Sequence, residues 1–394
     1  MAGRSDWSAW IGEARAADPL VVAQTLGVTL KKAGVEWIGP CPACGGTDRF
    51  AINTRKRVFN CRGAEGGDTI AMVEHITGCA FIEAVETITH SPRPDRSRDE
   101  KPEERAARLK RNAERNIGAQ QRAEEAAKLE AARARADERA VHEVLERAVP
   151  IWGTHGEAYM REGRGLTPSK RLTQDLRFVA DLDYWGSADN GAGKLTKLAI
   201  LPALIAIIRA FDGAIIGIQQ TYLDPKLPKK WEPTGSPHNS PKKIRGDKRG
   251  GMIRLGRMEE TMAIAEGWEN ALAWHQLGHA LQIENLGLGA AIDLGNLAGR
   301  SLGTISHRWL KNRDGKRIPI PSGRPDPSSP GMILPDGVKS VIILGDSNSE
   351  PLATVQHIKA AVRRFADYGI EVQLHWAPMG LDWNEQLLLE GPAA

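Results

Sequence analysis

Long apolar runs are missing from this chain of 394 residues. The longest one, residues 198–208 (LAILPALIAII), is shorter than the roughly 20 residues that a membrane-spanning helix needs, and Pro202 interrupts it. Acidic residues also break up residues 1–20, which excludes the apolar core of a secretory signal peptide. We therefore expect a cytoplasmic protein that has no membrane partner.

Cysteine is scarce as well, and all four cysteines lie between positions 41 and 79. A reducing cytoplasm disfavours disulfides, so clustered cysteines indicate metal or redox chemistry. Cys41, Cys44 and Cys61 have the spacing Cys-x2-Cys-x16-Cys, within CPACGGTDRF and VFNCRGAEGG. Paired thiolates on two glycine-flanked turns can close a tetrahedral shell, which predicts a zinc ribbon that binds Zn²⁺. The alternative is a set of reduced cysteines buried in a core.

The second cysteine turn is incomplete, because Ala64 stands where a fourth thiolate would fall. Water could fill the remaining coordination position, or a nearby side chain could: Asp68, His75 or Cys79. Cys79 is expected on the apolar face of a helix over residues 67–88, which favours a core role for this thiol. The sequence therefore predicts three thiolate ligands and leaves the fourth ligand unnamed.

The length predicts two or three domains, because single cores seldom grow beyond about 250 residues. With 41% hydrophobic and 26% charged residues, the composition is that of a globular protein. Shifts in composition divide the chain into four segments and predict an α+β protein of several domains. The segments are a cysteine-containing ribbon (1–90), a charged helical linker (91–149), a basic α+β region (150–257) and an α/β region (258–394).

The linker is dense in charge. Residues 101–150 contain 12 basic and 10 acidic residues, interleaved with alanine. Acidic and basic residues four positions apart support an exposed helix. Such pairs are Glu104/Arg108, Glu124/Lys128 and Glu143/Arg147. We expect a solvated helical spacer, with a nucleic-acid-binding arm as the alternative.

The net charge of +4 is unevenly distributed. Between Lys226 and Arg254, nine Lys or Arg residues stand against Glu232 and Asp247, so this stretch carries +7 and the rest of the chain −3. Basic residues among Gly, Pro and Ser predict a loop-rich surface that neutralises phosphates, and Trp231 offers a base-stacking face. The candidate phosphate-binding residues are Lys229, Lys230, Lys242, Lys243, Arg245 and Arg249. The alternative is a solvated charged loop without a ligand.

Short apolar strands are expected in the basic region, and from residue 258 onward strands alternate with helices. The expected strands cover 198–201, 214–223, 252–256, 261–267, 280–287, 339–349 and 371–378. The expected helices cover 268–278, 351–369 and 382–390, and a Pro/Ser-rich insertion occupies 311–336. Alternation of this kind favours a mainly parallel sheet with helices on both faces.

Acidic residues stand at the strand ends of the α/β region. Glu266 follows its first strand, Asp346 follows a later one, and Asp382 opens the closing helix. Ligands collect at the carboxyl ends of strands in open parallel sheets, so these three carboxylates can converge. Carboxylate oxygens suit Mg²⁺ or the similar Mn²⁺. The alternative is that each acid is a helix N-cap or a solvated turn residue.

The segments AIAEGWENALA, VIILGDSNSE and APMGLDWNEQL, in this order, resemble a Toprim domain, the metal-binding module shared by bacterial-type primases, topoisomerases and some nucleases. CPACGGTDRFAINTRKRVFNCRG and the GGDTIAMVEHI after it resemble the zinc ribbon of bacterial and phage primases, notably those of mobile elements. Between them, YMREGRGLTPSKRLTQDLRF, GAIIGIQQTYLD and KKWEPTGSPHNSPKKIRG resemble the N-terminal part of the primase catalytic core. The resemblance covers nearly the whole chain apart from the charged linker.

The resemblance implies roles for the acidic residues. Glu266 takes the place of the invariant Toprim glutamate, which acts in acid/base catalysis or metal binding. Asp346 takes the first position of an Asp-x-Asp motif, and Asn348 stands at the second. Asparagine can offer a carbonyl oxygen but removes one negative charge from the Mg²⁺ site, a loss that Glu350 would offset if the turn brings it inward. Asp382 aligns with an acidic position near the end of primase-type Toprim domains.

The implied activity is that of a DNA primase, a nucleotidyltransferase that makes short RNA primers from ribonucleoside triphosphates on a single-stranded DNA template, here for replication of a mobile element. No helicase motor is evident, so a separate replicative helicase is the expected partner where unwinding is needed. Two alternatives remain: a Toprim nuclease, and a DNA-binding relative of primases that has lost catalysis. Ala64 and Asn348 motivate the second alternative.

Template handling is expected from the zinc ribbon. Charged and aromatic residues lie side by side there in the sequence, and they offer phosphate contacts and stacking surface. These residues are Arg49, Phe50, Arg55, Lys56 and Phe59. In the alternative interpretation the two phenylalanines form the small core of the ribbon.

Overall fold

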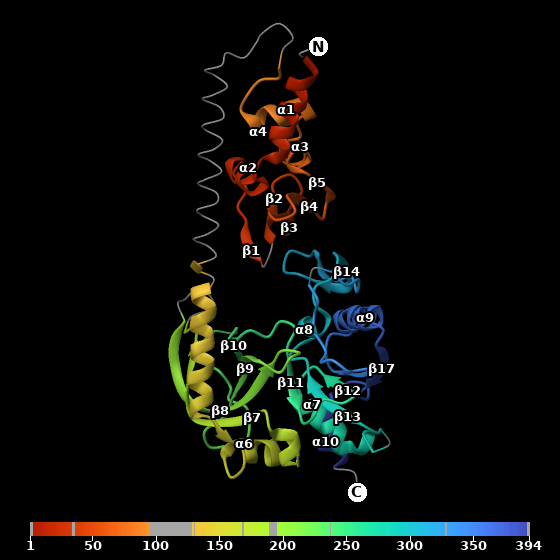
Figure 1. Cartoon of the computed structure of the whole chain (residues 1–394). Helices are drawn as coiled ribbons and strands as arrows, with labels where there is room; N and C mark the ends of the chain where they lie inside the picture. The colour runs from red at the N-terminus through yellow and green to blue at the C-terminus, as the bar shows by residue number, and fades with distance from the viewer. Residues whose placement is uncertain are drawn as a thin grey trace. The chain divides into compact units, whose positions relative to one another are not determined.

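The chain folds into two compact units, residues 1–131 and 132–394, in the computed structural model (Figure 1). The structure describes residues 3–33, 36–94, 128–129, 131–167, 169–188, 195–236, 238–281, 283–327 and 329–391. Most of the predicted linker, including Glu104, Arg108 and Glu124, lies outside these ranges. None of the helices in the described part of the chain has the length and apolarity that crossing a membrane requires.

The N-terminal unit contains a five-stranded antiparallel sheet in the order β1-β2-β3-β4-β5, together with helices in its described residues. Its strands are β1 (Lys31–Ala33), β2 (Glu36–Cys41), β3 (Gly45–Asn53), β4 (Val58–Cys61) and β5 (Ala64–Gly67). Its helices are α1 (Gly3–Ala16), α2 (Pro19–Thr25), α3 (Thr69–Thr77) and α4 (Phe81–Thr89). The helix predicted over 67–88 is therefore two helices, because Gly78 adopts the left-handed conformation (φ 71°) that ends α3.

The C-terminal unit is built on one mixed sheet of ten strands. Eight of them run in the order β10-β9-β8-β11-β13-β12-β16-β17, and β7 pairs with β8 and with β6. The strands of the first part are β6 (Val149–Pro150), β7 (Leu176–Gly186), β8 (Thr196–Arg209), β9 (Ile215–Tyr222), β10 (Lys242–Gly246) and β11 (Met252–Leu255). Strands predicted at 198–201, 214–223 and 252–256 are confirmed as β8, β9 and β11. The boundary suggested after residue 257 thus falls between two strands of the same sheet.

The carboxyl-terminal part of this sheet is parallel. Its strands are β12 (Thr261–Ala265), β13 (Leu286–Ala290), β16 (Ser340–Gly345) and β17 (Glu371–Trp376). Parallel pairs form between β13 and β12, between β12 and β16, and between β16 and β17. The helices of this part are α7 (Trp268–Trp274), α8 (Leu294–Ala298), α9 (Pro351–Asp367) and α10 (Trp383–Glu390). The predicted mainly parallel arrangement is confirmed for these four strands.

Helices cover both faces of the parallel strands. Along β12, Ala263 and Ala265 pack in a cluster with residues of α7 and α10, whereas Met262 and Ile264 pack with residues of α8 and α9. Successive side chains of a strand point to opposite faces, so both faces of a sheet covered in this way must be apolar. This explains why β12 and β16 read as continuous apolar runs.

The strand predicted over 280–287 is wrong, because β13 begins only at Leu286. Two glycines in LGLGA conceal the strand, since glycine is depleted in strands. Glycine is needed at position 287, where a Cβ would lie 2.4 Å from the sulfur of Met262 and 2.8 Å from the carbonyl of Arg257. Close packing of neighbouring strands therefore overrides local propensity here.

Two further segments differ from expectation. The insertion predicted as Pro/Ser-rich over 311–336 begins within a hairpin of β14 (Thr304–Lys311) and β15 (Arg317–Pro321). The charged linker ends in a helix over 131–147 that is not wholly solvated, since Val141 and Val144 are buried against the sheet. Before β7, the chain also forms the short helix α6 (His155–Ala158) and a π-helical turn, Tyr159–Gly163.

Candidate metal centre and carboxylate cluster

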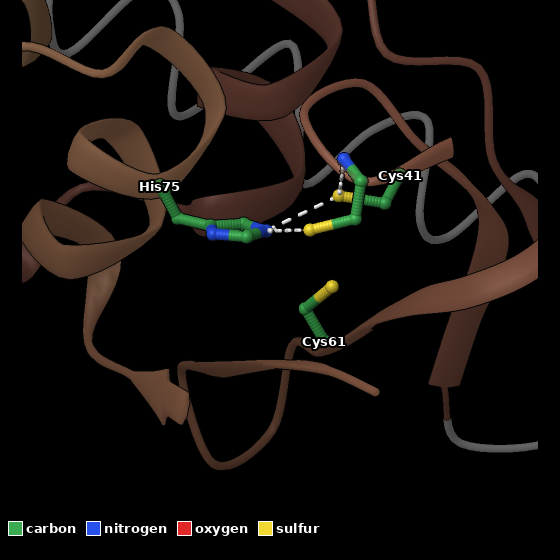
Figure 2. A group of neighbouring side chains, drawn as sticks. Cys41, Cys61 and His75 are labelled. Carbon is green, nitrogen blue, oxygen red and sulfur yellow. Dashed lines mark hydrogen bonds between the residues drawn. The ribbon is translucent and has the colours of Figure 1, made fainter. Parts of the chain in front are cut away.

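The N-terminal unit brings three cysteines and one histidine together. Ligand atoms of Cys41, Cys44, Cys61 and His75 all lie within 4.8 Å of one another. The Nε2 atom of His75 is 3.1 Å from the sulfur of Cys41 and 3.7 Å from that of Cys44. Figure 2 shows the side chains of Cys41, Cys61 and His75 pointing toward a common centre. The three predicted thiol ligands are therefore gathered in one place, and His75 supplies the fourth donor in place of Ala64.

Three secondary-structure elements position these donors. Cys41 ends β2, Cys61 ends β4, and His75 lies in the last turn of α3. The second turn approaches the first closely at Gly63, where a Cβ would lie 3.1 Å from the sulfur of Cys44. The other two candidate fourth ligands are not in the cluster, since Asp68 caps the N-terminus of α3 and Cys79 lies beyond its end.

The histidine ring is held by two phenylalanines. Phe50 and Phe59 stack on His75 with ring centroids 6.3 and 5.6 Å away, and their own exposed fractions are 0% and 3%. They are therefore the core of the ribbon, and the interpretation of these rings as a base-stacking surface is wrong. Packing against Phe50 and Phe59 fixes the orientation of the imidazole, and a metal-binding histidine needs a fixed ring orientation.

The donor set fits zinc. Three sulfurs and one imidazole nitrogen are a standard tetrahedral set for a structural Zn²⁺ site. Partial burial and the two neighbouring thiols raise the pKa of Cys44 to about 11, so this thiol would keep its proton unless a cation compensates the charge of its thiolate. Among the described residues, this is the one group of three or more Cys, His, Asp or Glu side chains with ligand atoms this close together.

A second cluster, of carboxylates, lies in the C-terminal unit. Glu266 follows β12, Asp346 follows β16, and Asp382 is the N-cap of α10. Parallel pairing of β12 with β16 places the first two acids at the same edge of the sheet. The three acids do not lie as close together as the zinc ligands do, and a hydrated Mg²⁺ does not require it, because Mg²⁺ retains several waters.

The electrostatics of Asp346 connect the three acids. Burial, reinforced by the charges of Asp382 and Glu266, raises the pKa of Asp346 to about 7. Burial also raises the pKa of Glu266. Unfavourable interaction between like charges in a partly buried site is relieved by a bound cation, so the arrangement fits a divalent metal.

Asn348 lies at the edge of this cluster and is exposed. Its side-chain amide donates to Oε2 of Glu385, at 2.7 Å, and Glu385 also forms a capping box with Asp382. Glu350 does not replace the missing charge. Its carboxylate accepts the backbone N–H groups of Leu352 and Ala353 and so caps α9.

Sequence reasoning missed a fourth acid at this edge. Asp293 follows β13, and its charge contributes to the raised pKa of Glu266. The carboxylate also contacts the amine of Lys248 and caps α8. Glu266 and Asp346 were predicted because ligands collect at the carboxyl ends of parallel strands. The same rule would have indicated Asp293 if β13 had been predicted at its true position.

Two of the predicted phosphate-binding lysines form ion pairs with a buried glutamate. Lys242 and Lys230 lie 2.8 and 3.1 Å from the carboxylate of Glu269, whose side chain is 6% exposed. Arg164 is 3.8 Å away, and the hydroxyl of Tyr159 donates to the same carboxylate. Burial opposes ionisation, but the three cations hold the pKa of Glu269 well below its usual range. This cluster joins residues that are far apart in the sequence.

Three of the other predicted basic residues have protein partners of their own, and Arg245 lies on β10. Lys229 pairs with Glu232 at 2.8 Å, and Arg249 pairs with Asp247 at 2.8 Å. Lys243 lies over the ring of Tyr184, 4.6 Å from its centroid. These contacts involve exposed or half-buried groups, so they leave phosphate binding as a prediction.

A cavity of about 420 Å³ opens beside the buried glutamate. Arg164, Lys229 and Lys230 contribute cations to its wall, and Trp231 contributes an aromatic face. Trp231 is also packed edge-on against Tyr184, at 4.7 Å between centroids, so only part of its ring is available. Glu232 also lies in the wall and pairs with Lys229, so the wall carries charges of both signs.

Comparisons with known proteins identify two segments of the chain. Residues 16–104 match a family described as the CHC2 zinc finger, the zinc ribbon of DnaG, and residues 135–255 match a domain of unknown function, DUF7146. A stretch of 63 residues is 41% identical to the DNA primase of Halalkalibacterium halodurans. This stretch covers 16% of the chain and only 10% of that relative. The predicted resemblance to a primase zinc ribbon is confirmed for the N-terminal segment.

Solved structures of primases are remote neighbours. The zinc-binding and RNA polymerase domains of the Aquifex aeolicus primase are 16% identical, with a TM-score of 0.34 over 97% of this chain and 82% of that one. A DnaG catalytic domain bound to single-stranded DNA is 15% identical, with a TM-score of 0.33 over 61% of this chain and 73% of that one. A likeness this remote does not test the interpretation of residues 258–394 as a Toprim domain. That interpretation stays a prediction.

Proposed function

We propose that this protein is a primase-like nucleotidyltransferase that joins ribonucleotides on a single-stranded DNA template. The observation that supports this most directly is the convergence of Glu266, Asp346 and Asp382 at the carboxyl edge of a parallel sheet, in a chain whose N-terminal segment matches a primase zinc ribbon. The four segments of the sequence would then be a zinc ribbon, a linker, the N-terminal part of a primase core and a Toprim domain. Service to a mobile element is part of the same proposal.

The carboxylates would hold Mg²⁺ or Mn²⁺, with the carbonyl oxygen of Asn348 as an additional ligand. A divalent cation at this position would stabilise the attacking and the departing oxygens of an in-line displacement at phosphorus. Glu266 has a pKa raised by burial, which suits a group that accepts a proton from a 3′-hydroxyl. The carboxylate of Asp346 is held in place by two hydrogen bonds from Asn270.

The cavity beside Glu269 is the proposed site for a triphosphate. Its cations would contact phosphate oxygens, which determine affinity and position but carry no sequence information. Lys229 and Lys230 lie in its wall, and Lys242 contacts Glu269 behind it. Lys243, Arg245 and Arg249 would extend the phosphate contacts toward the template.

One assay tests the activity directly. The protein is incubated with single-stranded DNA, labelled ribonucleotides and Mg²⁺ or Mn²⁺, beside the variants Glu266→Gln and Glu260→Gln. Glu266 follows the carboxyl end of β12, whereas Glu260 precedes its amino end and pairs with Lys339. The second variant is therefore a matched control for the loss of one acid.

Oligoribonucleotides from the native protein and from Glu260→Gln, but not from Glu266→Gln, are the expected result. Shortened template would instead indicate a nuclease. A shifted template without any product would indicate a relative that binds DNA and has lost catalysis, an alternative favoured by the exposed position of Asn348. Either of these two results would overturn the proposed function.

A further inference from the structure

The hairpin of β14 and β15 carries a strong local charge that the proposed catalytic site does not use. Residues 304–321 contain five cations and one acid, Asp314, and every residue from 308 to 319 is exposed. The cations are Arg308, Lys311, Arg313, Lys316 and Arg317. None of the ion pairs among the described residues involves these five side chains. The hairpin therefore presents a net charge of +4 to solvent, with His307 counted as neutral.

A large tryptophan is exposed on the same hairpin. The side chain of Trp309 is 67% exposed, and the guanidinium of Arg308 lies 5.2 Å from the centroid of its ring. The register of the two strands shifts between Ser306 and Lys311, so the intervening residues bulge out of β14. Bulges of this kind redirect side chains away from a sheet.

The bulge is held by a buried histidine. His307 is 2% exposed, and its Nδ1 accepts the backbone N–H groups of Trp309 and Leu310 at 3.1 and 2.8 Å. Its Nε2 contacts the carboxylate of Glu350 at 2.8 Å. An Nδ1 that accepts hydrogen bonds carries no proton, so Nε2 is the donor to Glu350. The backbone that carries the tryptophan is thus connected to the N-terminus of α9.

Contacts at the base of the hairpin complete its support. The N–H of Leu302 donates to the carbonyl of Arg324 at 2.7 Å, and Arg363 on α9 donates to the carbonyl of Gly323 at 2.9 Å. In Figure 1, β14 lies near α9 and α8 within the C-terminal unit. An exposed aromatic ring on a supported backbone is prepared to bind at little cost in conformational entropy.

We infer that this hairpin is a contact site for single-stranded DNA outside the proposed catalytic site. Cations that flank an exposed aromatic ring offer phosphate contacts together with a face on which a base can stack. Bases in a duplex are already stacked on each other, which favours a single strand as the occupant. The choice of DNA as the strand rests on the proposed function, whereas the contact itself requires neither nucleotide nor catalysis.

The test measures binding of a fluorescent oligothymidylate by anisotropy, without ribonucleotides and without added divalent metal, to the full chain and its variants. Trp309→Ala is expected to weaken binding about tenfold, and Trp309→Phe to restore most of it, because stacking on one ring contributes at this level. Lys311→Gln/Lys316→Gln is expected to reduce the slope of log affinity against log salt by about 1.4, since each phosphate contact to a single strand contributes about 0.7.

Two control variants separate this site from general effects of charge and hydrophobicity. Lys197→Gln/Lys339→Gln removes the same charge from exposed positions elsewhere, and Tyr368→Ala removes another exposed aromatic ring. Both controls are expected to bind like the native protein. Binding by the hairpin variants equal to that of the controls would overturn the inference, as would an equal loss in all variants or a preference for duplex of the same length.

The result is independent of the primer-synthesis assay. If the hairpin variants lose binding but no primers are made, the contact site stands and the proposed function fails. If primers are made and the hairpin variants bind normally, the proposed function stands and the contact site fails. Where both stand, Trp309→Ala is expected to raise the template concentration for half-maximal synthesis about tenfold and to leave the rate at saturating template unchanged.

Discussion

The side-chain amide of Asn270 donates to both carboxylate oxygens of Asp346, at 2.9 Å each. Its own carbonyl accepts the backbone N–H of Asn384 in the first turn of α10, at 3.2 Å. One neutral side chain on α7 therefore connects the end of β16 to the start of α10. Because an amide carries no net charge, it orients the carboxylate of Asp346 and leaves its negative charge for a cation to neutralise.

Replacement of Asp346 by Asn tests whether the site is strained by charge. Burial raises the pKa of Asp346 from 3.8 to about 7. The folded state thus binds more protons than the unfolded state between these values, and its stability falls as pH rises through this window. Asp346→Asn removes the charge, so we expect it to stabilise the protein by roughly 2–4 kcal/mol at pH 8 and by much less at pH 5. Urea unfolding without added Mg²⁺ measures both values.

Addition of Mg²⁺ should make the native protein more stable than Asp346→Asn at pH 8. A ligand that binds only the folded state stabilises it by mass action, and the native carboxylate binds the cation better than an amide does. Tryptophan fluorescence is a suitable signal, because eight of the eleven tryptophans lie beyond residue 131. Equal stability of the two proteins at pH 8, with and without Mg²⁺, would contradict the interpretation of Asp346 as a cation ligand.

Restoring an acid at position 348 should strengthen the proposed metal site. The amide of Asn348 donates to Glu385 in the native protein, so Asn348→Asp replaces this hydrogen bond with a like-charge contact between exposed groups. We expect a cost of about 0.5–1 kcal/mol without metal and a severalfold lower Mg²⁺ concentration for half of the maximal rise in Tm. Ser349→Asp adds the same charge one residue further on. If both variants respond to Mg²⁺ alike, the effect is one of net charge and not of coordination.

The parallel strands and the three thiol ligands could be predicted because their signals are local. Apolar runs mark β12 and β16, and the spacing of the cysteines follows from two tight turns. The position of Glu266, Asp346 and Asp382 at one edge then follows from the topology of parallel sheets. Predicting the position of these acids required only the order of strands and helices.

The remaining site residues depend on contacts between distant segments. His75 lies on a helix, and only packing against Phe50 and Phe59 turns its ring toward the thiols. Glu269 meets Lys230 and Lys242 because β10 and α7 come together in the folded unit, which no local pattern reports. The sequence therefore indicated a basic segment, but it did not show that Lys230 and Lys242 pair with a buried carboxylate.

Removal of the imidazole tests the zinc site. A structural zinc site contributes roughly 10–16 kcal/mol, so loss of one of four ligands is expected to weaken binding by about 3 kcal/mol, or about a hundredfold. His75→Ala should therefore lose zinc to a chelator that leaves the native protein with close to one zinc per chain. Cys79→Ser is the matched control, because this thiol lies outside the cluster. Elemental analysis after dialysis decides, and zinc retention by His75→Ala would exclude the imidazole as a ligand.

Neutralisation of Glu269 should be among the most damaging single changes in the C-terminal unit. Its side chain is 6% exposed and faces three cations, so Glu269→Gln leaves buried positive charge without compensation. We expect a loss of about 3–5 kcal/mol in the free energy of unfolding. The depressed pKa of Glu269 means that this stabilisation is complete above about pH 5 and is lost as pH falls below the usual value for glutamate. Glu232→Gln removes an ion pair whose glutamate is 83% exposed and should cost less than about 1 kcal/mol. Urea unfolding at pH 7 and pH 4 compares the two variants, and similar losses for both would show that the buried cluster contributes no more than a surface ion pair.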